Sequence, residues 1–225
     1  MTLNLRLCLV FGLGLLCLPG ASFASALELR QQGLEYRAQQ RWTEAIDVLK
    51  RSVALSPQEV SGYVILGWTQ HLARDPDASQ TLWQALRLDA WAAEAANALG
   101  IVYLVRGELT PAILVHSWAS LIKPQNEIAH YNLCLAFHRS GLPDWAIAHG
   151  ERAMLLEPFN PHPIVAVALV YWDLGEPEKA TKLYSDALAL DSNYQSASYL
   201  DHLAEAGFSQ EQVAVTRKIH DQLFP

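Results

Sequence analysis

Apolar residues along most of the chain recur at spacings of three and four, and each run of them ends at a glycine, a proline or a polar turn. One run contains Leu99, Val102 and Tyr103, and the next run, after a short turn, contains Ile113 and Leu114. Spacings of three and four place side chains on one face of an α-helix. The pattern therefore predicts short helices that follow one another through tight turns.

The residues between the runs indicate where the helices begin and end. Glycine allows the left-handed backbone that closes many helices, and proline fits the first turn of the next helix. The residues concerned are Gly107, Gly141 and Gly175, which lie 34 positions apart, with Pro111, Pro143 and Pro177 shortly after them. Each unit is therefore predicted to be a pair of helices.

Small residues repeat in the same register, at steps of 33 or 34 positions. Three series lie within the units: Gly33, Gly67, Gly100, Cys134 and Ala168; Ala45, Ala78, Ala112, Ala146 and Ala180; and Ser52, Ala85, Ala119, Ala153 and Ala187. A fourth series closes the units: Pro57, Ala90, Pro124, Pro158 and Ser192. Small side chains let paired helices approach closely, and stacked hairpins of one fixed period form a solenoid.

The stretches "GLEYRAQQRWTEAIDVLKRSVALSP" and "ALVYWDLGEPEKATKLYSDALALD" resemble the tetratricopeptide repeat family. The resemblance implies an all-α, right-handed α-solenoid of about five helical hairpins over residues 27–192. The units are expected at about 27–59, 60–92, 93–126, 127–160 and 161–194, and residues 195–225 are expected to form a degenerate sixth repeat or capping hairpin with a polar outer face.

The chain departs from the family pattern at several positions, of which Gly150 has the clearest expected cost. The family usually places a bulky residue there. Glycine in a helix interior costs about 1 kcal/mol relative to alanine, so Gly150 is expected to loosen unit four by that amount.

Residues 1–26 have the layout of a secretory signal peptide, with an apolar core from Leu7 to Leu18, then Pro-Gly and small residues before Leu27. The core spans 12 residues before Pro19, which is expected to break it, whereas a membrane-spanning helix needs about 20. We expect cleavage after Ala26, with an uncleaved anchor as the alternative. The predicted location is an exported one, the periplasm or an equivalent extracytoplasmic compartment, and membrane association is expected if the segment is retained.

Composition narrows the classes of function. The formal charge of −7 makes nucleic acid a poor partner. Histidines do not form H-E-x-x-H, no cysteine pair has ligand spacing, and neither G-x-S-x-G nor a phosphate loop occurs. We therefore predict no catalysis, no metal, no cofactor and no small-molecule substrate. Cys134 is expected to be an inert buried thiol, His130 a packed or hydrogen-bonded residue, and His162 a residue at a helix start.

In the family the first helices line a concave surface, so the resemblance implies a partner-binding groove formed by the matching positions. These are Arg30, Leu34, Arg37, Val64, Trp68, His71, Asn97, Ile101, Leu104, Tyr131, Leu135, His138, Arg139, Val165, Leu169, Trp172, Asp173 and Tyr199. The set is mainly apolar and aromatic, which suits an extended peptide or one amphipathic helix. Trp68 and Trp172 have the alternative role of stabilising neighbouring helices, and Asn97 is a candidate for binding a peptide backbone.

A carboxylate clamp of the kind found in some family members is disfavoured. The matching positions hold Arg30, Leu34, Ile65, Glu94 and Ala98, so the asparagine pair and later basic residues are missing.

The sequence thus predicts a noncatalytic adaptor or scaffold that binds a peptide or helix of a partner protein, in assembly of a membrane or secretion complex. One alternative is a self-assembling structural protein, a homo-oligomer that associates through apolar end faces or the convex surface. A membrane-tethered scaffold with an uncleaved signal is the other. Four tryptophans outside the inner set, Trp42, Trp83, Trp118 and Trp145, are expected mainly in the core, with oligomer contacts as their alternative role.

Overall fold

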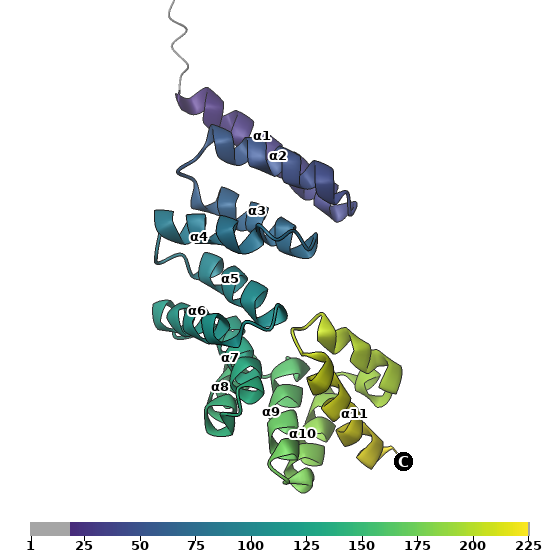
Figure 1. The fold of residues 1–225 in the computed structure, drawn as a ribbon. Coiled ribbons are helices and arrows are strands. Elements are labelled where there is room, and N and C mark those ends of the chain that lie inside the picture. Colours follow the sequence, from purple (N-terminus) through teal and green to yellow (C-terminus); the bar gives the residue numbers. More distant parts are fainter. Residues whose placement is uncertain (1–18, 225) are drawn as a thin grey trace, which may run out of the picture.

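The computed structural model describes residues 19–224, so the apolar core predicted from Leu7 to Leu18 lies outside the described residues. Five helical hairpins follow one another along the chain (Figure 1). Their first helices are α1 (Pro19–Ala38), α3 (Val60–Leu72), α5 (Ala93–Val105), α7 (Glu127–Arg139) and α9 (Pro161–Asp173). Their second helices are α2 (Trp42–Leu55), α4 (Ala78–Leu88), α6 (Leu109–Ile122), α8 (Pro143–Leu156) and α10 (Pro177–Leu190).

Each helix packs against the next one along the chain, and the first helices α3, α5, α7 and α9 also contact one another in sequence. The first helices therefore form an inner layer and the second helices an outer layer (Figure 1). The predicted all-α solenoid of stacked hairpins is confirmed. Residues 19–224 contain no strand, and none of the helices in this part is both long enough and apolar enough to cross a membrane.

The repeated small residues lie where paired helices touch. A Cβ atom on Gly33 would lie 2.5 Å from Cγ of Leu49, and one on Gly67 would lie 2.6 Å from Cγ of Leu82. Distances below 3.0 Å leave no room for a methyl group. The third glycine, Gly100, has the same relation to the ring of His116 in α6. The sequence prediction of close helix contacts at these positions is confirmed.

The turns between the helices also follow the sequence pattern. Gly107, Gly141 and Gly175 have positive φ angles of 78°, 68° and 76°, the left-handed conformation that glycine adopts at low cost. Pro143 and Pro177 begin α8 and α10. Helix α1 also begins at a proline, Pro19, so this residue starts a helix instead of only ending the apolar run.

The helix α1 passes through the predicted cleavage position. The Ala26 carbonyl oxygen accepts a hydrogen bond of 2.7 Å from the buried Ser52 hydroxyl. In the described chain, Ala26 and Leu27 are therefore consecutive residues of one helix that packs on α2.

The tail after α10 does not form a sixth α-helical hairpin stacked on the fifth. It consists of two 3₁₀ segments, η1 (Ser192–Gln195) and η2 (Ala197–Ala204), and the helix α11 (Gln210–Leu223). In η2 the buried residues Leu200 and Leu203 are three positions apart, the period at which 3₁₀ side chains align. Instead of presenting a mostly solvated face, α11 packs against both α9 and α10.

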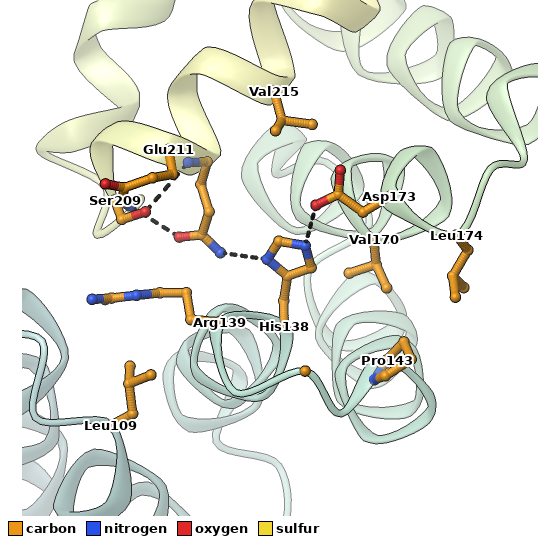
Figure 2. Close-up of a pocket in the computed structure, with 12 residues that line it drawn as sticks. Leu109, His138, Arg139, Pro143, Val170, Asp173, Leu174, Ser209, Glu211 and Val215 are labelled. Atoms are coloured by element: carbon orange, nitrogen blue, oxygen red, sulfur yellow. Dashed lines mark hydrogen bonds and ion pairs between the residues drawn. The ribbon is translucent and has the colours of Figure 1, made fainter.

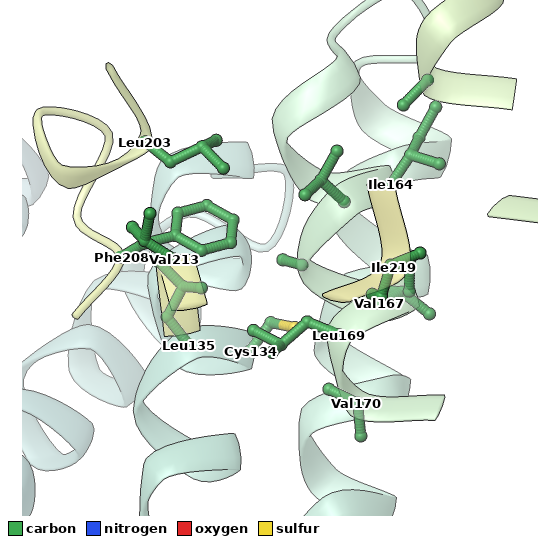
Figure 3. Close-up of a cluster of buried hydrophobic side chains, with 14 of the residues drawn as sticks. Cys134, Leu135, Ile164, Val167, Leu169, Val170, Leu203, Phe208, Val213 and Ile219 are labelled. Carbon is green, nitrogen blue, oxygen red and sulfur yellow. The ribbon is translucent and has the colours of Figure 1, made fainter. Parts of the chain in front are cut away.

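The apolar residues of the tail join the core of the last hairpins (Figure 3). Phe208, Val213 and Ile219 are buried in one cluster with Leu135 and Leu169. The tail covers the inner side of the last hairpins, and its role as a cap stays a prediction.

Candidate functional site

The predicted groove is divided into an open half and a covered half. Helices α1, α3 and α5 form the open half, where seven of the predicted residues stay partly exposed: Leu34, Arg37, Val64, Trp68, His71, Asn97 and Ile101. The tail covers the inner side of α7 and α9, which form the other half.

The open half is an apolar surface with an aromatic centre. The rings of Trp68 and His71 lie 5.1 Å apart on one face of α3. Burial lowers the pKa of His71, and the nearby charge of Arg106 lowers it further, so the imidazole is neutral at pH 7. An uncharged ring beside Trp68 makes this part of the surface suitable for apolar side chains of a partner.

Two predicted residues of the open half are already engaged within the chain. Arg30 is only 8% exposed and donates a 2.8 Å hydrogen bond to the Ser61 hydroxyl of α3. Asn97 and Asn126 exchange two hydrogen bonds of 3.0 Å, and the Asn126 side chain also caps α7 by accepting from the Ala129 amide. The prediction that Arg30 lines an open groove is therefore wrong, whereas Asn97 stays partly exposed beside Asn126 and its role in binding a peptide backbone stays a prediction.

The covered half, together with Leu104 at the end of α5, contains the remaining apolar positions of the predicted groove. Leu104, Leu135, Val165 and Leu169 are fully buried, so they cannot line an open groove. The Tyr131 hydroxyl donates a 2.6 Å hydrogen bond to the carbonyl of Ala206 in the tail. The sequence prediction is corrected at all of these positions, because the chain's own tail occupies the surface.

The two other aromatic positions have internal contacts as well. Trp172 is half-buried against the core cluster of the last hairpins. Tyr199 lies in η2, donates to the Asp191 carboxylate at 2.8 Å and stacks on His202 with ring centroids 4.0 Å apart. Tyr199 is therefore part of the tail's own packing instead of a wall of the groove.

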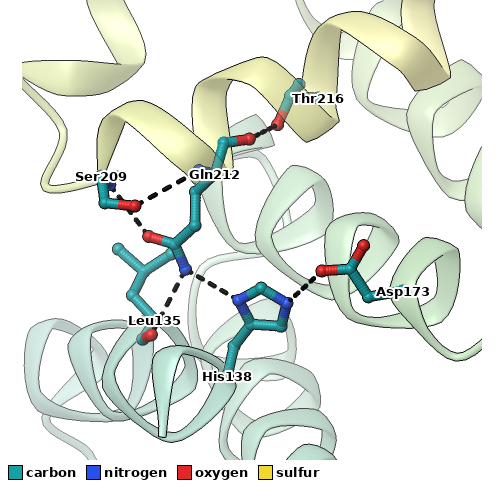
Figure 4. A network of polar contacts seen from close by, with 6 residues as sticks. All are labelled: Leu135, His138, Asp173, Ser209, Gln212 and Thr216. Atoms are coloured by element: carbon teal, nitrogen blue, oxygen red, sulfur yellow. Dashed lines mark hydrogen bonds and ion pairs between the residues drawn. The ribbon is translucent and has the colours of Figure 1, made fainter. Parts of the chain in front are cut away.

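A polar network holds the tail in place (Figure 4). The Gln212 side-chain amide donates to the Leu135 carbonyl at 3.3 Å and contacts Nδ1 of His138 at 3.1 Å. The other ring nitrogen of His138 lies 2.9 Å from the Asp173 carboxylate. Ser209 and Gln212 cap the start of α11 by bonding each other's backbone amides. The network therefore joins α7, α9 and α11.

A cleft of about 630 Å³ lies beside this network, between α7, α9 and α11 (Figure 2). Ser209, His138 and Asp173 all line it, but they do not form a nucleophilic triad, since both nitrogens of His138 are bonded to Gln212 and Asp173. Burial lowers the pKa of Arg139, and the neighbouring charge of Glu211 opposes this shift. The Arg139 guanidinium donates a hydrogen bond of 2.8 Å to the Leu104 carbonyl. The polar groups of the cleft serve to fix the tail.

The other candidates for chemistry are packed residues. Burial raises the pKa of the Cys134 thiol to about 12, so this cysteine stays protonated and unreactive, as predicted. His130 lies 2.8 Å from His149 between their Nδ1 atoms, and His162 follows the first residue of α9, so both predictions for these histidines are confirmed. Groups of three or more potential metal ligands do not occur within residues 19–224.

Three of the four outer tryptophans differ from the expectation of a core position. Trp83, Trp118 and Trp145 are exposed on the second helices, and only Trp42 is half-buried. The sequence analysis missed this surface because an aromatic residue in a hairpin helix can face either the partner helix or water, and the repeat register alone does not distinguish them.

Comparisons with known proteins support the fold. Neither the protein-family models nor the curated protein sequences contain a match to this chain. Among solved structures, MamA protein matches with a TM-score of 0.67 and 24% identity, over 77% of this chain and 94% of that one. PilF of Pseudomonas aeruginosa matches with a TM-score of 0.70 and 19% identity, over 91% and 94%. YrrB, described as a TPR protein with an unusual peptide-binding site, matches with a TM-score of 0.61 and 14% identity, over 76% and 93%.

Proposed function

Because the chain is a tetratricopeptide-repeat protein by register and by fold, we propose that it is a noncatalytic adaptor that binds a peptide or helix of a partner protein. The binding surface in this proposal is the open half of the concave face, formed by α1, α3 and α5. Leu34, Val64, Trp68 and Ile101 supply its apolar contacts, and Arg37 lies beside them.

The observation that carries the proposal is the position of α11. This amphipathic helix lies on α9 and bonds to α7 through Gln212, so the inner layer of the solenoid already holds one helix. The first helices of a solenoid present equivalent surfaces in successive units. The equivalent surface of the first three units carries partly exposed apolar residues, and no segment within residues 19–224 covers it as α11 covers α9. A second helix or an extended peptide fits there by the same mode of recognition.

We further propose an exported location, the periplasm or an equivalent extracytoplasmic compartment, and a partner that belongs to a membrane or secretion complex. The layout of residues 1–26 supports export. Retention of this segment would make the same adaptor a membrane-tethered scaffold. The similarity to YrrB supports a peptide ligand, because the description of that protein names a peptide-binding site.

Photocrosslinking in the native cell tests the proposed surface. A photoreactive amino acid at Ile101 should give a discrete adduct with one partner, which mass spectrometry identifies. The same amino acid at Leu135, beneath the tail, or at Phe159, in the turn between α8 and α9, should not give this adduct.

Trp68→Ala in the Ile101 crosslinking variant should lower the adduct yield at least about tenfold, because aromatic anchors dominate the energy of such interfaces. Circular dichroism should show unchanged helicity. An adduct of equal yield from Phe159, or a yield from Ile101 that Trp68→Ala does not change, would show that the open half is not the binding surface.

A further inference from the structure

The outer face of the second and third hairpins carries a contiguous apolar surface, which we call the convex patch. It consists of Trp83 (44% exposed), Trp91 (68%), Leu114 (66%), Trp118 (38%) and Leu121 (72%). The rings of Trp91 and Trp118 lie 5.4 Å apart, and Leu114, Trp118 and Leu121 follow one face of α6 at steps of four and three. Single exposed apolar residues are common in proteins, whereas a contiguous patch marks an interaction surface.

The helix α6 is unusually apolar for a helix on the outer, solvent-facing layer. Its sequence, LTPAILVHSWASLI, contains no acidic residue, lysine or arginine, and its histidine, His116, is buried. The other outer helices α2, α4, α8 and α10 all contain charged residues. A helix with an apolar outer face is stabilised when another surface covers it, and covering α6 would desolvate no charge.

Two of the three tryptophans of the patch, Trp83 and Trp118, are fixed by hydrogen bonds within the chain. Nε1 of Trp83 donates to the Tyr103 hydroxyl at 2.8 Å, and Nε1 of Trp118 donates to the Ala90 carbonyl at 2.8 Å. A partner can therefore cover both rings without leaving an indole N–H unpaired. Because the rings are already held in place, binding costs little side-chain entropy.

The patch contains both a hollow and projecting side chains. The hollow has a volume of about 300 Å³ and is lined by Trp83, Leu86, Ala90, Leu114, Val115 and Trp118. Leu121 and Trp91 project beside it and are the most exposed members of the patch. A two-fold interface uses one surface on both copies, so that surface must carry each knob together with the hole that receives it.

We propose that the convex patch is the interface of a two-fold symmetric homodimer, in which Leu121 of each copy enters the hollow of the other. At about 200 Å² per large side chain, the exposed fractions give roughly 600 Å² of apolar surface per copy. The pair buries roughly 1,200 Å², the lower limit for a specific interface, which predicts a reversible dimer. This association leaves the concave face free, so it is independent of the proposed adaptor function.

The charges favour a second copy over a lipid surface. The formal charge of −7 opposes approach to an anionic membrane and to a second copy alike, so the charges around the patch decide between them. Near the ends of α4 and α6 the exposed charges are of both signs, Arg87 and Lys123 with Asp89. Mixed charges around an apolar centre suit a protein interface.

Sedimentation equilibrium over a concentration series tests the dimer. The mass of the native chain should rise with concentration from the monomer value of 25.0 kDa toward twice that value. The variant Leu114→Ser/Leu121→Ser should weaken association at least about a hundredfold. The matched control is Phe159→Ser, which removes a side chain that is 84% exposed and lies outside the patch, and it should behave as the native chain.

Three results would overturn the proposal: a native chain that stays monomeric at millimolar concentration, a double variant that dimerises like the native chain, or a control variant that dissociates equally. Flotation with phosphatidylglycerol and phosphatidylcholine vesicles separates the remaining alternative. A monomer that floats with vesicles, and loses this property in Leu114→Ser/Leu121→Ser, would assign the patch to a membrane and refute the dimer.

Discussion

At the scale of single residues, Gly150 shows why a helix position has to be read in its packing environment. The sequence pattern treats this glycine as a weak point of unit four. In the structure, a Cβ atom at this position would lie 2.3 Å from Cγ2 of Val167 and 2.9 Å from Sγ of Cys134. Helices α7 and α9 therefore approach α8 closely because residue 150 has no side chain. The prediction that Gly150 loosens unit four therefore overlooks the close contact that this glycine allows.

The variant Gly150→Ala should lower the free energy of unfolding by roughly 1–3 kcal/mol, because overpacking a buried contact costs more than the helix propensity of alanine returns. Urea unfolding measures the change. Ala148→Gly is the control on the exposed side of the same helix, where propensity alone predicts a loss of about 1 kcal/mol. A more stable Gly150→Ala variant would mean that α8 can move away from its neighbours.

His116 is a second residue whose environment decides its chemistry. Its ring is fully buried against Gly100, and neither ring nitrogen has a hydrogen-bond partner among residues 19–224. Burial lowers the pKa of His116 to about 3, and the nearby Gly100 backbone opposes this shift by a smaller amount. The folded chain therefore keeps this ring neutral at pH values where the unfolded chain protonates it.

The pH dependence of unfolding follows from this difference. Above the ordinary histidine pKa of about 6.5 both states are neutral at this position, and stability is fully retained. As the pH falls from about 6.5 toward about 3, only the unfolded state binds the proton, so stability decreases by up to about 1.4 kcal/mol per pH unit. Below about pH 3 the folded ring is protonated as well, and this contribution no longer changes.

His116→Leu should remove this loss and the cost of two unpaired nitrogens. We expect the variant to be more stable than the native chain by about 1–3 kcal/mol at pH 7, with a difference that widens at pH 5 and pH 4. Urea unfolding at the three pH values measures both effects. Parallel pH profiles of the two proteins would show that His116 is hydrated or paired in solution.

At the scale of elements, the five hairpins could be predicted from the sequence and the tail could not. The hairpins repeat small residues at contacts such as that of Gly33 with Leu49, and one period places all of them. The tail has no repeat to align with, because its path depends on long-range contacts between residues such as Gln212 and Leu135. Two features of the sequence could have indicated that the tail packs on the solenoid. They are the spacing of three between Leu200 and Leu203, and the apolar residues of α11.

The same distinction explains the candidate groove. Register places the candidate residues of α1, α3 and α5 on the inner layer of the solenoid, and it places Leu135 and Leu169 there too. It does not show that a distant segment covers the latter two. Single side chains such as Arg30 were misplaced because a buried bond to Ser61 is a local choice of rotamer that the period does not specify.

We expect the docking of α11 to depend on the buried side chain of Gln212 as well as on the apolar contacts of the tail. Gln212→Ala should increase the exchange rate of α11 amide hydrogens about 10- to 100-fold. The substitution leaves the Leu135 carbonyl and His138 without the Gln212 amide as a hydrogen-bond partner, at a cost of about 1–3 kcal/mol. Exchange in α4 and α5 should stay unchanged. Hydrogen exchange with mass spectrometry measures both regions.

Gln210→Ala is the matched control for this experiment, since Gln210 begins the same helix and is exposed. It should leave exchange in α11 close to that of the native chain. If Gln212→Ala had no greater effect than Gln210→Ala, apolar contacts of residues such as Phe208 and Val213 would hold the tail without help from the polar network.

At the scale of the whole molecule, the two sides of the solenoid have different roles in our proposals. The concave side is half-filled by the tail and half-open for a partner, while the convex patch on α4 and α6 pairs two copies. Both can operate together, because they lie on opposite layers of the stack. A dimer would then present two open grooves, which raises the effective affinity for a partner complex that contains repeated binding segments.

The last prediction concerns the N-terminal segment, which decides whether such a dimer diffuses or stays at a membrane. Cleavage requires an unfolded backbone at the cut, and Ala26 lies within α1, so removal of residues 1–26 has to precede folding of this helix. We expect N-terminal sequencing of the protein from its native cell to begin near Leu27 or Ser25, and we expect the protein in the soluble envelope fraction. The mature chain keeps the contact of Gly33 with Leu49, so the first hairpin should remain folded. An N-terminus at Met1 or Thr2, in a chain that resists a carbonate wash, would instead make the protein a tethered scaffold.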